Sequence, residues 1–233
     1  MTRGAPPVAI PWLAGASLVM YDVDRYPFAD WLAGAVFKVR RLDELHEAWL
    51  RHKLAKGLAP TLGYADNLRL RSLMQQLPDD SPFYTLYRRF VRRVLAPRFD
   101  GKISYASHPK MRVHLAGTPT VSKWHRDVEV TGRAELITVW LPFTDASGSN
   151  ALWVESGYGA GDHRPVTVAY GQALIFDGGF LEHGTVANDS ARSRVSIDFR
   201  FSPIGPQTPP AAQAIYACRP GPPAAAGVAA APR

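Results

Sequence analysis

Hydrophobic and polar residues follow two different periods along this chain, and the period changes near residue 103. Up to about residue 100, apolar residues recur every three or four positions, which is the spacing of helices that bury one face. One helix is expected to begin near residue 42 and a second near residue 67. A third is expected at Ser81-Pro82, where a serine able to cap a helix precedes a proline in the first turn. This part of the chain is therefore predicted to be mostly helical.

From residue 103 to residue 203 the period becomes two, which is the spacing of strands with one buried face. Turn-forming sequences such as 145–150 and 157–162 divide this region into short segments. Eight strands are expected, over residues 111–114, 120–126, 135–142, 151–155, 165–168, 173–176, 182–187 and 194–201. Eight short strands at this spacing predict a mainly β fold, a double-stranded β-helix (the jelly roll of cupins) with the N-terminal helices packed on it.

The composition is compatible with one structural domain in three parts. The chain has 233 residues, of which 46% are hydrophobic, so it can bury a substantial core. A helical part over residues 1–102 is expected to pack on a jelly-roll core over residues 103–203. Residues 204–233 are rich in proline and alanine and contain few large apolar residues, so we expect a disordered tail there.

Charge, cysteine content and hydropathy narrow the possible partners. The net charge is +7, which a solvated basic face explains most simply, with an anionic cosubstrate or nucleic acid as the alternative. Cys218 is the only cysteine, which excludes an intrachain disulfide and favours a reducing cytoplasm. No apolar run reaches the roughly 18 residues of a membrane-spanning helix, so no membrane partner is expected. The oligomeric state is left open.

The most informative residues are His125, Asp127 and His183. Two neutral imidazoles and one carboxylate are the ligand set that binds Fe(II) on one face and leaves the other face open. On a strand over 120–126, His125 and Asp127 would point the same way, and His183 would approach from across the barrel mouth. Arg194 follows in an alternating segment, where its guanidinium could bind a dicarboxylate. The alternative is two half-buried histidines with no metal and an unrelated arginine.

A family resemblance rests on these residues and on the segments around them. Residues 124–127, 136–142, 150–154 and 183–185, with Arg194, resemble the Fe(II)/2-oxoglutarate oxygenases of the phytanoyl-CoA hydroxylase-like group. Within that group the chain is most similar to the oxygenases of aminoglycoside-antibiotic biosynthesis, of the streptomycin and hygromycin types. Two segments depart from the group's pattern: residues 155–158 replace a common Pro-Gly-Ser-His, and residues 112–114 lack a common glutamine.

The resemblance implies a role for each matched residue. His125, Asp127 and His183 would be the ligands of Fe(II), and Arg194 would bind the distal carboxylate of 2-oxoglutarate. Thr185 or Ser196 would donate a hydroxyl to that carboxylate. Four more residues would lie beside the cosubstrate: Arg112, His114, Thr138 and Trp140. The presence of Asp127 implies hydroxylation, desaturation or oxidative ring closure with O2, because halogenating relatives carry a small residue in its place.

The substrate implied is an aminoglycoside-type natural product, cationic and sugar-like, and the reaction is C–H oxidation such as hydroxylation or orthoester closure. Carboxylates would bind its cations and aromatic rings would stack on its sugars. The candidates at the ends of expected strands are Trp124, Glu155, Asp177, Phe180 and Glu182. One alternative is a nucleic-acid alkylation-repair dioxygenase, suggested by the spacing of Arg194 and Arg200, although no base-stacking lid is evident. The other is a non-oxidative cupin, either a sugar isomerase or a binding module.

Overall fold

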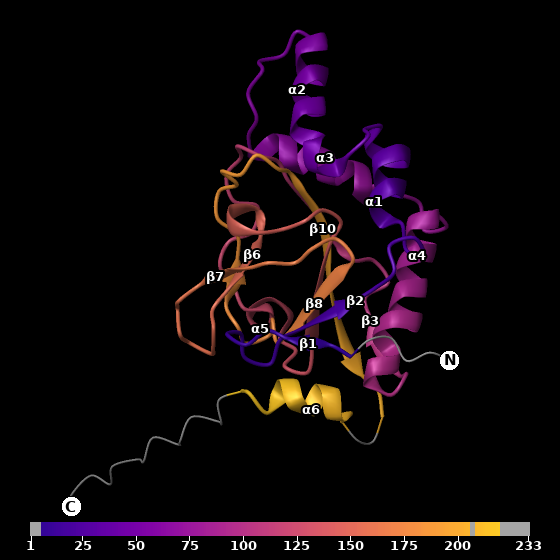
Figure 1. Cartoon of the computed structure of the whole chain (residues 1–233), viewed down its shortest axis with the longest axis vertical. Coiled ribbons are helices and arrows are strands. Elements are labelled where there is room, and N and C mark those ends of the chain that lie inside the picture. The colour runs from indigo at the N-terminus through magenta and orange to yellow at the C-terminus, as the bar shows by residue number, and fades with distance from the viewer. Residues whose placement is uncertain (1–5, 206–207, 220–233) are drawn as a thin grey trace, which may run out of the picture.

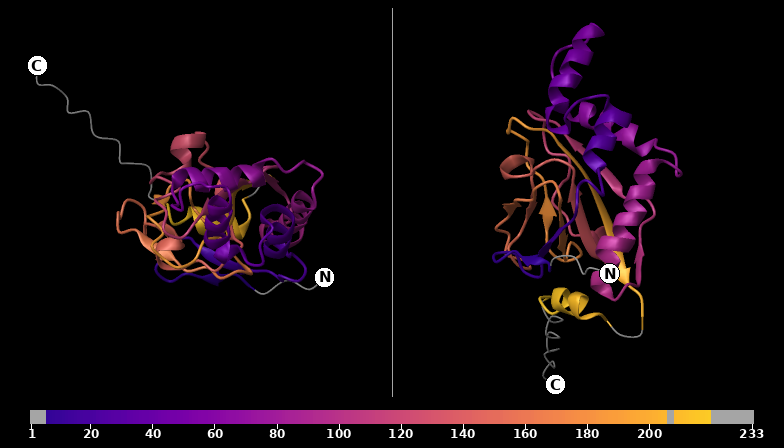
Figure 2. Two further views of the ribbon diagram at one scale, coloured as in Figure 1. Left: turned by 90° about the horizontal axis from the view of Figure 1, so that it is seen from above. Right: turned by 45° about the vertical axis from the view of Figure 1, so that its right-hand side comes forward.

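Two antiparallel sheets face each other in the computed structural model, which describes residues 6–205 and 208–219. Helices lie against the outer side of the larger sheet (Figure 1). The right-hand view of Figure 2 shows the layers in profile: helices on one side, the larger sheet in the middle and the smaller sheet on the other side. This is the jelly-roll architecture with packed N-terminal helices, so the predicted fold class is confirmed.

The larger sheet is built around its longest strand, β10 (Arg194–Pro203), which pairs with three others. On one side β10 pairs with β5 (Ile137–Pro142), and the sheet continues through β8 (Gln172–Phe176), β2 (Ser17–Met20) and β1 (Val8–Ala9). On the other side it pairs with β3 (Ile103–Tyr105) and β4 (Lys110–His114). The smaller sheet has the order β7 (Arg164–Val166), β6 (Leu152–Val154), β9 (His183–Gly184).

The helices before the barrel begin close to the positions that the apolar period predicts. The structure has α1 (Phe28–Trp31), η1 (Leu32–Phe37), η2 (Leu42–Glu44), α2 (Leu45–Ala55), α3 (Tyr64–Gln75), α4 (Pro82–Phe90), η3 (Val91–Leu95) and η4 (Ala96–Phe99). Later in the chain come α5 (Asp127–Thr131), η5 (Gly148–Asn150) and α6 (Pro210–Tyr216). No helix among the described residues is long and apolar enough to cross a membrane.

Alternation along β5 and β10 divides the interior into two clusters. Val139, Val195 and Phe199 point toward the helices and join the main hydrophobic core. Their neighbours on the same strands point toward the smaller sheet, where Trp140 packs with Leu152 in the second core. Since successive side chains of a strand face opposite sides, β10 presents its polar residues to the space between the sheets.

Two expectations about local structure are wrong. Residues 120–126 form no regular strand; the contact there is an isolated bridge between His125 and His183, and helix α5 begins at Asp127. The N-terminal part is mostly helical, as predicted, although β1 and β2 within it belong to the larger sheet. Within the segment expected to be a disordered tail, α6 is folded, with Ala212 and Ile215 buried; residues 206–207 and 220–233 lie outside the described part.

Candidate metal and cosubstrate site

The three predicted metal ligands come together between the two sheets. His125 and His183 bond to each other through the backbone, with N–H to carbonyl distances of 3.1 and 3.0 Å. The backbone N–H of Asp127 donates to the carbonyl of Gly178 at 2.8 Å, which fixes the start of α5. One ligand atom from each of the three side chains lies within 4.8 Å of the others. The tertiary structure therefore forms the His-Asp-His cluster that the spacing suggested.

Both histidines are held in the tautomer that a metal requires. Nδ1 of His125 lies 2.8 Å from the carbonyl of Lys123, and Nδ1 of His183 lies 2.9 Å from that of Leu181. A carbonyl only accepts, so each Nδ1 carries the proton and each Nε2 is free to bind a metal. Burial lowers the pKa of His183 to about 4, although the negative charge of Asp127 acts to raise it. The imidazole of His183 is therefore neutral.

Both carboxylate oxygens of Asp127 accept hydrogen bonds, and one of them, Oδ1, also faces the histidines. Its Oδ2 accepts from Thr138 Oγ1 at 2.6 Å and from Arg200 Nε at 2.9 Å. Its Oδ1 lies 3.7 Å from Nε2 of His125 and 4.0 Å from Nε2 of His183, and Arg200 Nη2 also contacts it. Burial acts to raise the pKa of Asp127, but Arg200, His183 and Thr138 outweigh it and hold that pKa below its usual value.

Two glycines are required by close approaches at this cluster. A Cβ on Gly178 would lie 2.8 Å from Cβ of Thr138 and 3.0 Å from Oδ2 of Asp127. A Cβ on Gly184 would lie 2.7 Å from the ring of Trp124. The sequence marked Gly178 only as part of a turn, and its role next to the carboxylate depends on a contact between distant segments.

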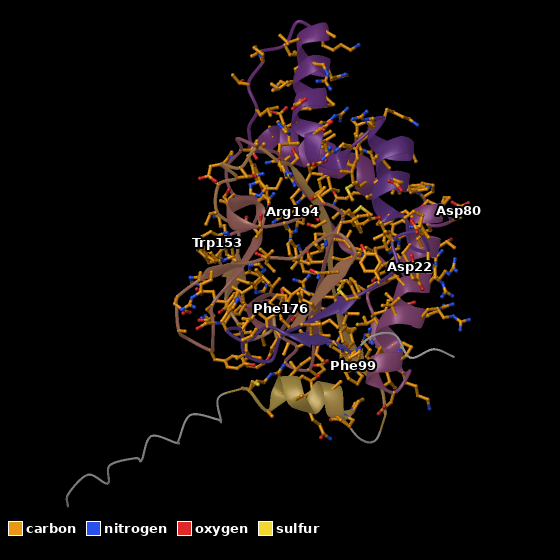
Figure 3. The ribbon with its side chains drawn as sticks, in the orientation of Figure 1. Asp22, Asp80, Phe99, Trp153, Phe176 and Arg194 are labelled. Carbon is orange, nitrogen blue, oxygen red and sulfur yellow. The ribbon has the colours of Figure 1, made fainter. Side chains whose placement is uncertain are left out.

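Arg194, labelled in Figure 3, lines a cavity that has walls from both sheets. It is only 2% exposed, donates through Nη1 to the carbonyl of Asn150 at 2.8 Å, and lies 5.5 Å from the ring centroid of Trp140. Its Nε has no partner, and it forms no ion pair with any described carboxylate. Burial and the charge of Arg112 lower the pKa of Arg194 to about 9. A buried guanidinium left without an anion is costly, which indicates a place for an anionic ligand.

The two hydroxyls expected near Arg194 have different surroundings. Oγ of Ser196 is buried without a partner, two residues along the same face of β10. Oγ1 of Thr185 instead accepts from the backbone of Val121 and Ser122 at 3.1 and 3.0 Å and bonds to Thr120 Oγ1 at 2.7 Å. Thr185 therefore lines the cavity with its hydroxyl engaged by the loop before His125, whereas Ser196 has an unpartnered hydroxyl but is not among the residues that line the cavity.

The other residues expected beside the cosubstrate divide into two groups. Trp140 lines the cavity, and His114 is paired in register with Arg194, with both ring nitrogens buried and unpartnered. Burial and the charge of Arg194 lower the pKa of His114 to about 3, so it is neutral. Thr138 binds Asp127 rather than standing free, and Arg112 donates to Asp198 at 3.0 Å. Sequence reasoning missed Asp198 and the contact of Arg200 with Asp127.

None of the five proposed substrate residues is among those that line the cavity. Glu155 and Asp177 are buried: Glu155 accepts from the backbone of Glu182 at 2.7 Å, and Asp177 pairs with Arg219 at 2.6 Å. The guanidinium carbon of Arg219 also lies 4.3 Å from the ring centroid of Phe180. These three hold loops in place. Trp124 is 42% exposed and stacks on His163, whose Nε2 lies 2.9 Å from Glu182.

Comparisons with known proteins place the chain in a family. It is 32% identical to the streptomycin biosynthesis protein StrG of Streptomyces griseus over 198 residues, which cover 82% of this chain and 86% of StrG. AviO1 of Streptomyces viridochromogenes has a similar structure, with a TM-score of 0.52 and 18% identity over 85% of this chain and 93% of AviO1. A 2OG-Fe(II) oxygenase family oxidoreductase of Burkholderia pseudomallei overlaps 55% of this chain and 61% of its own, with 15% identity and a TM-score of 0.38. No protein-family model matches the chain.

This chain belongs to the family of StrG. The resemblance to proteins of streptomycin biosynthesis is thereby confirmed, and the likeness to AviO1 shows a shared fold. The cluster of His125, Asp127 and His183 is a ligand set that suits Fe(II).

Proposed function

We propose that the protein is a dioxygenase that oxidises a C–H bond of an aminoglycoside-type natural product, by hydroxylation or by oxidative ring closure such as orthoester formation. The observation that carries this proposal is the buried Arg194 without a counter-ion, in the same cavity as His125 and His183. A metal cluster alone would suit many enzymes. A metal cluster beside a buried, unpaired guanidinium fits a cosubstrate that has a carboxylate at its far end.

In this proposal the residues in and around the cavity divide into metal ligands, cosubstrate-binding residues and apolar walls. Nε2 of His125, Oδ1 of Asp127 and Nε2 of His183 hold the iron, since these atoms face one another. Arg194 and Ser196 bind the distal carboxylate of 2-oxoglutarate through donors that no described residue uses. With both bound, iron and 2-oxoglutarate supply an oxidant for C–H bonds by oxidative decarboxylation of the cosubstrate. Apolar walls that include Trp140, Leu152 and Phe176 exclude water from the cosubstrate.

The substrate is assigned to a sugar-like class from two observations. StrG is by its name a protein of streptomycin biosynthesis, and this chain is similar to it over most of both lengths. The exposed Trp124, stacked on His163 just before the first metal ligand, offers an aromatic face on which a sugar ring can stack. Glu182 is partly exposed beside it and supplies a carboxylate, shared with Arg126, for a cationic group.

Titration of the anaerobic Fe(II) protein with 2-oxoglutarate tests the core of the proposal. We expect a weak visible charge-transfer band to appear, and we expect no band with His125→Ala or Asp127→Ala. A protein that binds Fe(II) but shows no band on adding 2-oxoglutarate would be a non-oxidative cupin. With the band established, coupled turnover with aminoglycosides and their precursors identifies the substrate. Turnover of none of them, but of alkylated DNA, would support the repair alternative.

A further inference from the structure

A chain of four charged side chains runs away from the metal cluster along one face of the larger sheet. Asp127 pairs with Arg200, Arg200 Nη1 donates to Asp198 Oδ2 at 2.7 Å, and Arg112 Nε donates to Asp198 Oδ1 at 3.0 Å. All four side chains are largely or wholly buried, so these pairs are little screened by water. The family resemblance assigns no role to Arg200 or Asp198.

The position of Arg200 is determined by strand register. Arg200 is opposite Thr138 on β5, and Asp198 lies two residues earlier on the same face of β10. Asp198 binds the outer nitrogen Nη1, which leaves Nε and Nη2 directed at Asp127. The guanidinium is therefore fixed between two carboxylates in a planar geometry that a lysine ammonium cannot reproduce.

The two carboxylate oxygens of Asp127 have different surroundings. Thr138 Oγ1 and Arg200 Nε both donate to Oδ2, so that oxygen already has two short hydrogen bonds. The oxygen that faces both histidines is Oδ1, which accepts one hydrogen bond, from Arg200 Nη2. A carboxylate held in this way binds a metal through one oxygen, which leaves further coordination positions for a chelating cosubstrate and O2.

We propose that Arg200 is a positioning residue that, together with Thr138 and fixed by Asp198, restricts Asp127 to metal binding through Oδ1 alone. With a metal on Oδ1, the bond from Arg200 Nε to Oδ2 would still hold the other oxygen away from it. This inference rests on the proposed metal site. It adds a specific requirement: metal affinity depends on a residue that does not itself touch the metal.

Cobalt(II) binding to the purified full chain tests the role of Arg200 without activity, because cobalt absorption reports coordination number. Arg200→Met removes Nε and Nη2, the two donors of Arg200 to Asp127, and keeps an unbranched side chain. It is expected to weaken cobalt affinity about 10–100-fold. Its cobalt spectrum is also expected to change, because Asp127 is free to bind through two oxygens. Arg200→Lys should recover only part of the loss, since one ammonium cannot serve Asp127 and Asp198 together.

Two further variants keep the test decisive. Thr138→Val removes the second donor to Oδ2 with little change of volume and should weaken cobalt binding, by less than Arg200→Met. It tests the same requirement if Arg200→Met folds poorly. Arg192→Gln is the matched control and should bind as the wild type, because Arg192 lies just before β10 with its side chain 58% exposed. Wild-type affinity and spectrum in folded Arg200→Met and in Thr138→Val would overturn the proposal, and so would tighter binding in either. Cobalt binding that persists in His183→Ala would instead overturn the metal site itself.

Discussion

Thr138 and Arg200 lie opposite each other on neighbouring strands, and both donate a hydrogen bond to the same oxygen of Asp127. Asp127 comes from the first turn of α5, so three separate segments meet at one carboxylate. Gly178 makes the meeting possible, because any side chain there would collide with Thr138. The metal site thus depends on a carboxylate oriented by the larger sheet and on two histidines, each oriented by the backbone carbonyl two residues before it.

Replacing Arg194 should weaken 2-oxoglutarate binding with little effect on iron. Its guanidinium is buried and has no anionic partner among the described residues, so its charge is available to the cosubstrate. A charge-assisted bond is worth about 1.5–3 kcal/mol, so Arg194→Lys should raise the dissociation constant roughly 10–100-fold. The charge-transfer titration measures it, with Arg192→Gln as control. Unchanged affinity would assign the carboxylate to another cation, with Arg112 the nearest alternative.

Ser196→Ala and Thr185→Ala should affect different properties, the first cosubstrate affinity and the second stability. Ser196 Oγ has no partner in the described structure, so its loss should weaken 2-oxoglutarate while the protein remains equally stable. Thr185 Oγ1 holds the loop at Val121 and Ser122, so its loss should lower the free energy of unfolding by about 1–3 kcal/mol. Urea unfolding and cosubstrate titration of both variants measure the two effects. If Thr185→Ala lowers cosubstrate affinity more than Ser196→Ala, the assignment of the hydroxyls is reversed.

His114 should make stability depend on mildly acidic pH. Its pKa is lowered from 6.5 to about 3 in the folded protein, mainly by burial. Between these values the unfolded chain binds a proton that the folded protein does not, so stability is greatest above pH 6.5 and falls as the pH decreases. From pH 7 to pH 5 the wild type should lose about 2 kcal/mol more than His114→Gln, which cannot titrate at this position. Urea unfolding at both pH values measures the difference, and equal losses would contradict it.

Arg219→Ala should lower the free energy of unfolding, although Arg219 lies after α6 and outside the barrel strands. The guanidinium forms two hydrogen bonds to Asp177, at 2.6 and 2.9 Å, and lies 4.3 Å from the ring centroids of Phe180 and Tyr216. Without it the buried carboxylate of Asp177 keeps only the hydroxyl of Tyr158, and we expect a loss of about 3 kcal/mol.

The double variant Arg219→Ala/Asp177→Asn provides the control for that prediction. It removes the uncompensated charge, so thermal or urea unfolding should show part of the stability restored. If both proteins unfold at the wild-type midpoint, the docking of the C-terminal segment contributes nothing to stability. Either way the result tests residues that were expected to lie in a disordered tail.

The sequence by itself was enough to predict what depends on local periodicity and on residue chemistry. Three-to-four-residue spacing predicted helices that the structure has as α2, α3 and α4, and alternation predicted strands such as β5, β8 and β10. The types and spacing of His125, Asp127 and His183 were sufficient to suggest their meeting, because few other ligand sets suit an open iron site.

Only the tertiary structure decided how these pieces combine. Residues 120–126 alternate like a strand, but their backbone pairs with β9 only at His125, and α5 follows at once. Segment 210–216 has the composition of a tail, yet it folds where Ala212 and Ile215 can be buried against the barrel. The contacts of Arg200 with Asp127 and Asp198 depend on strand register, which joins residues far apart in the chain. Such contacts leave no periodic signal, because long-range packing selects them and local preference does not.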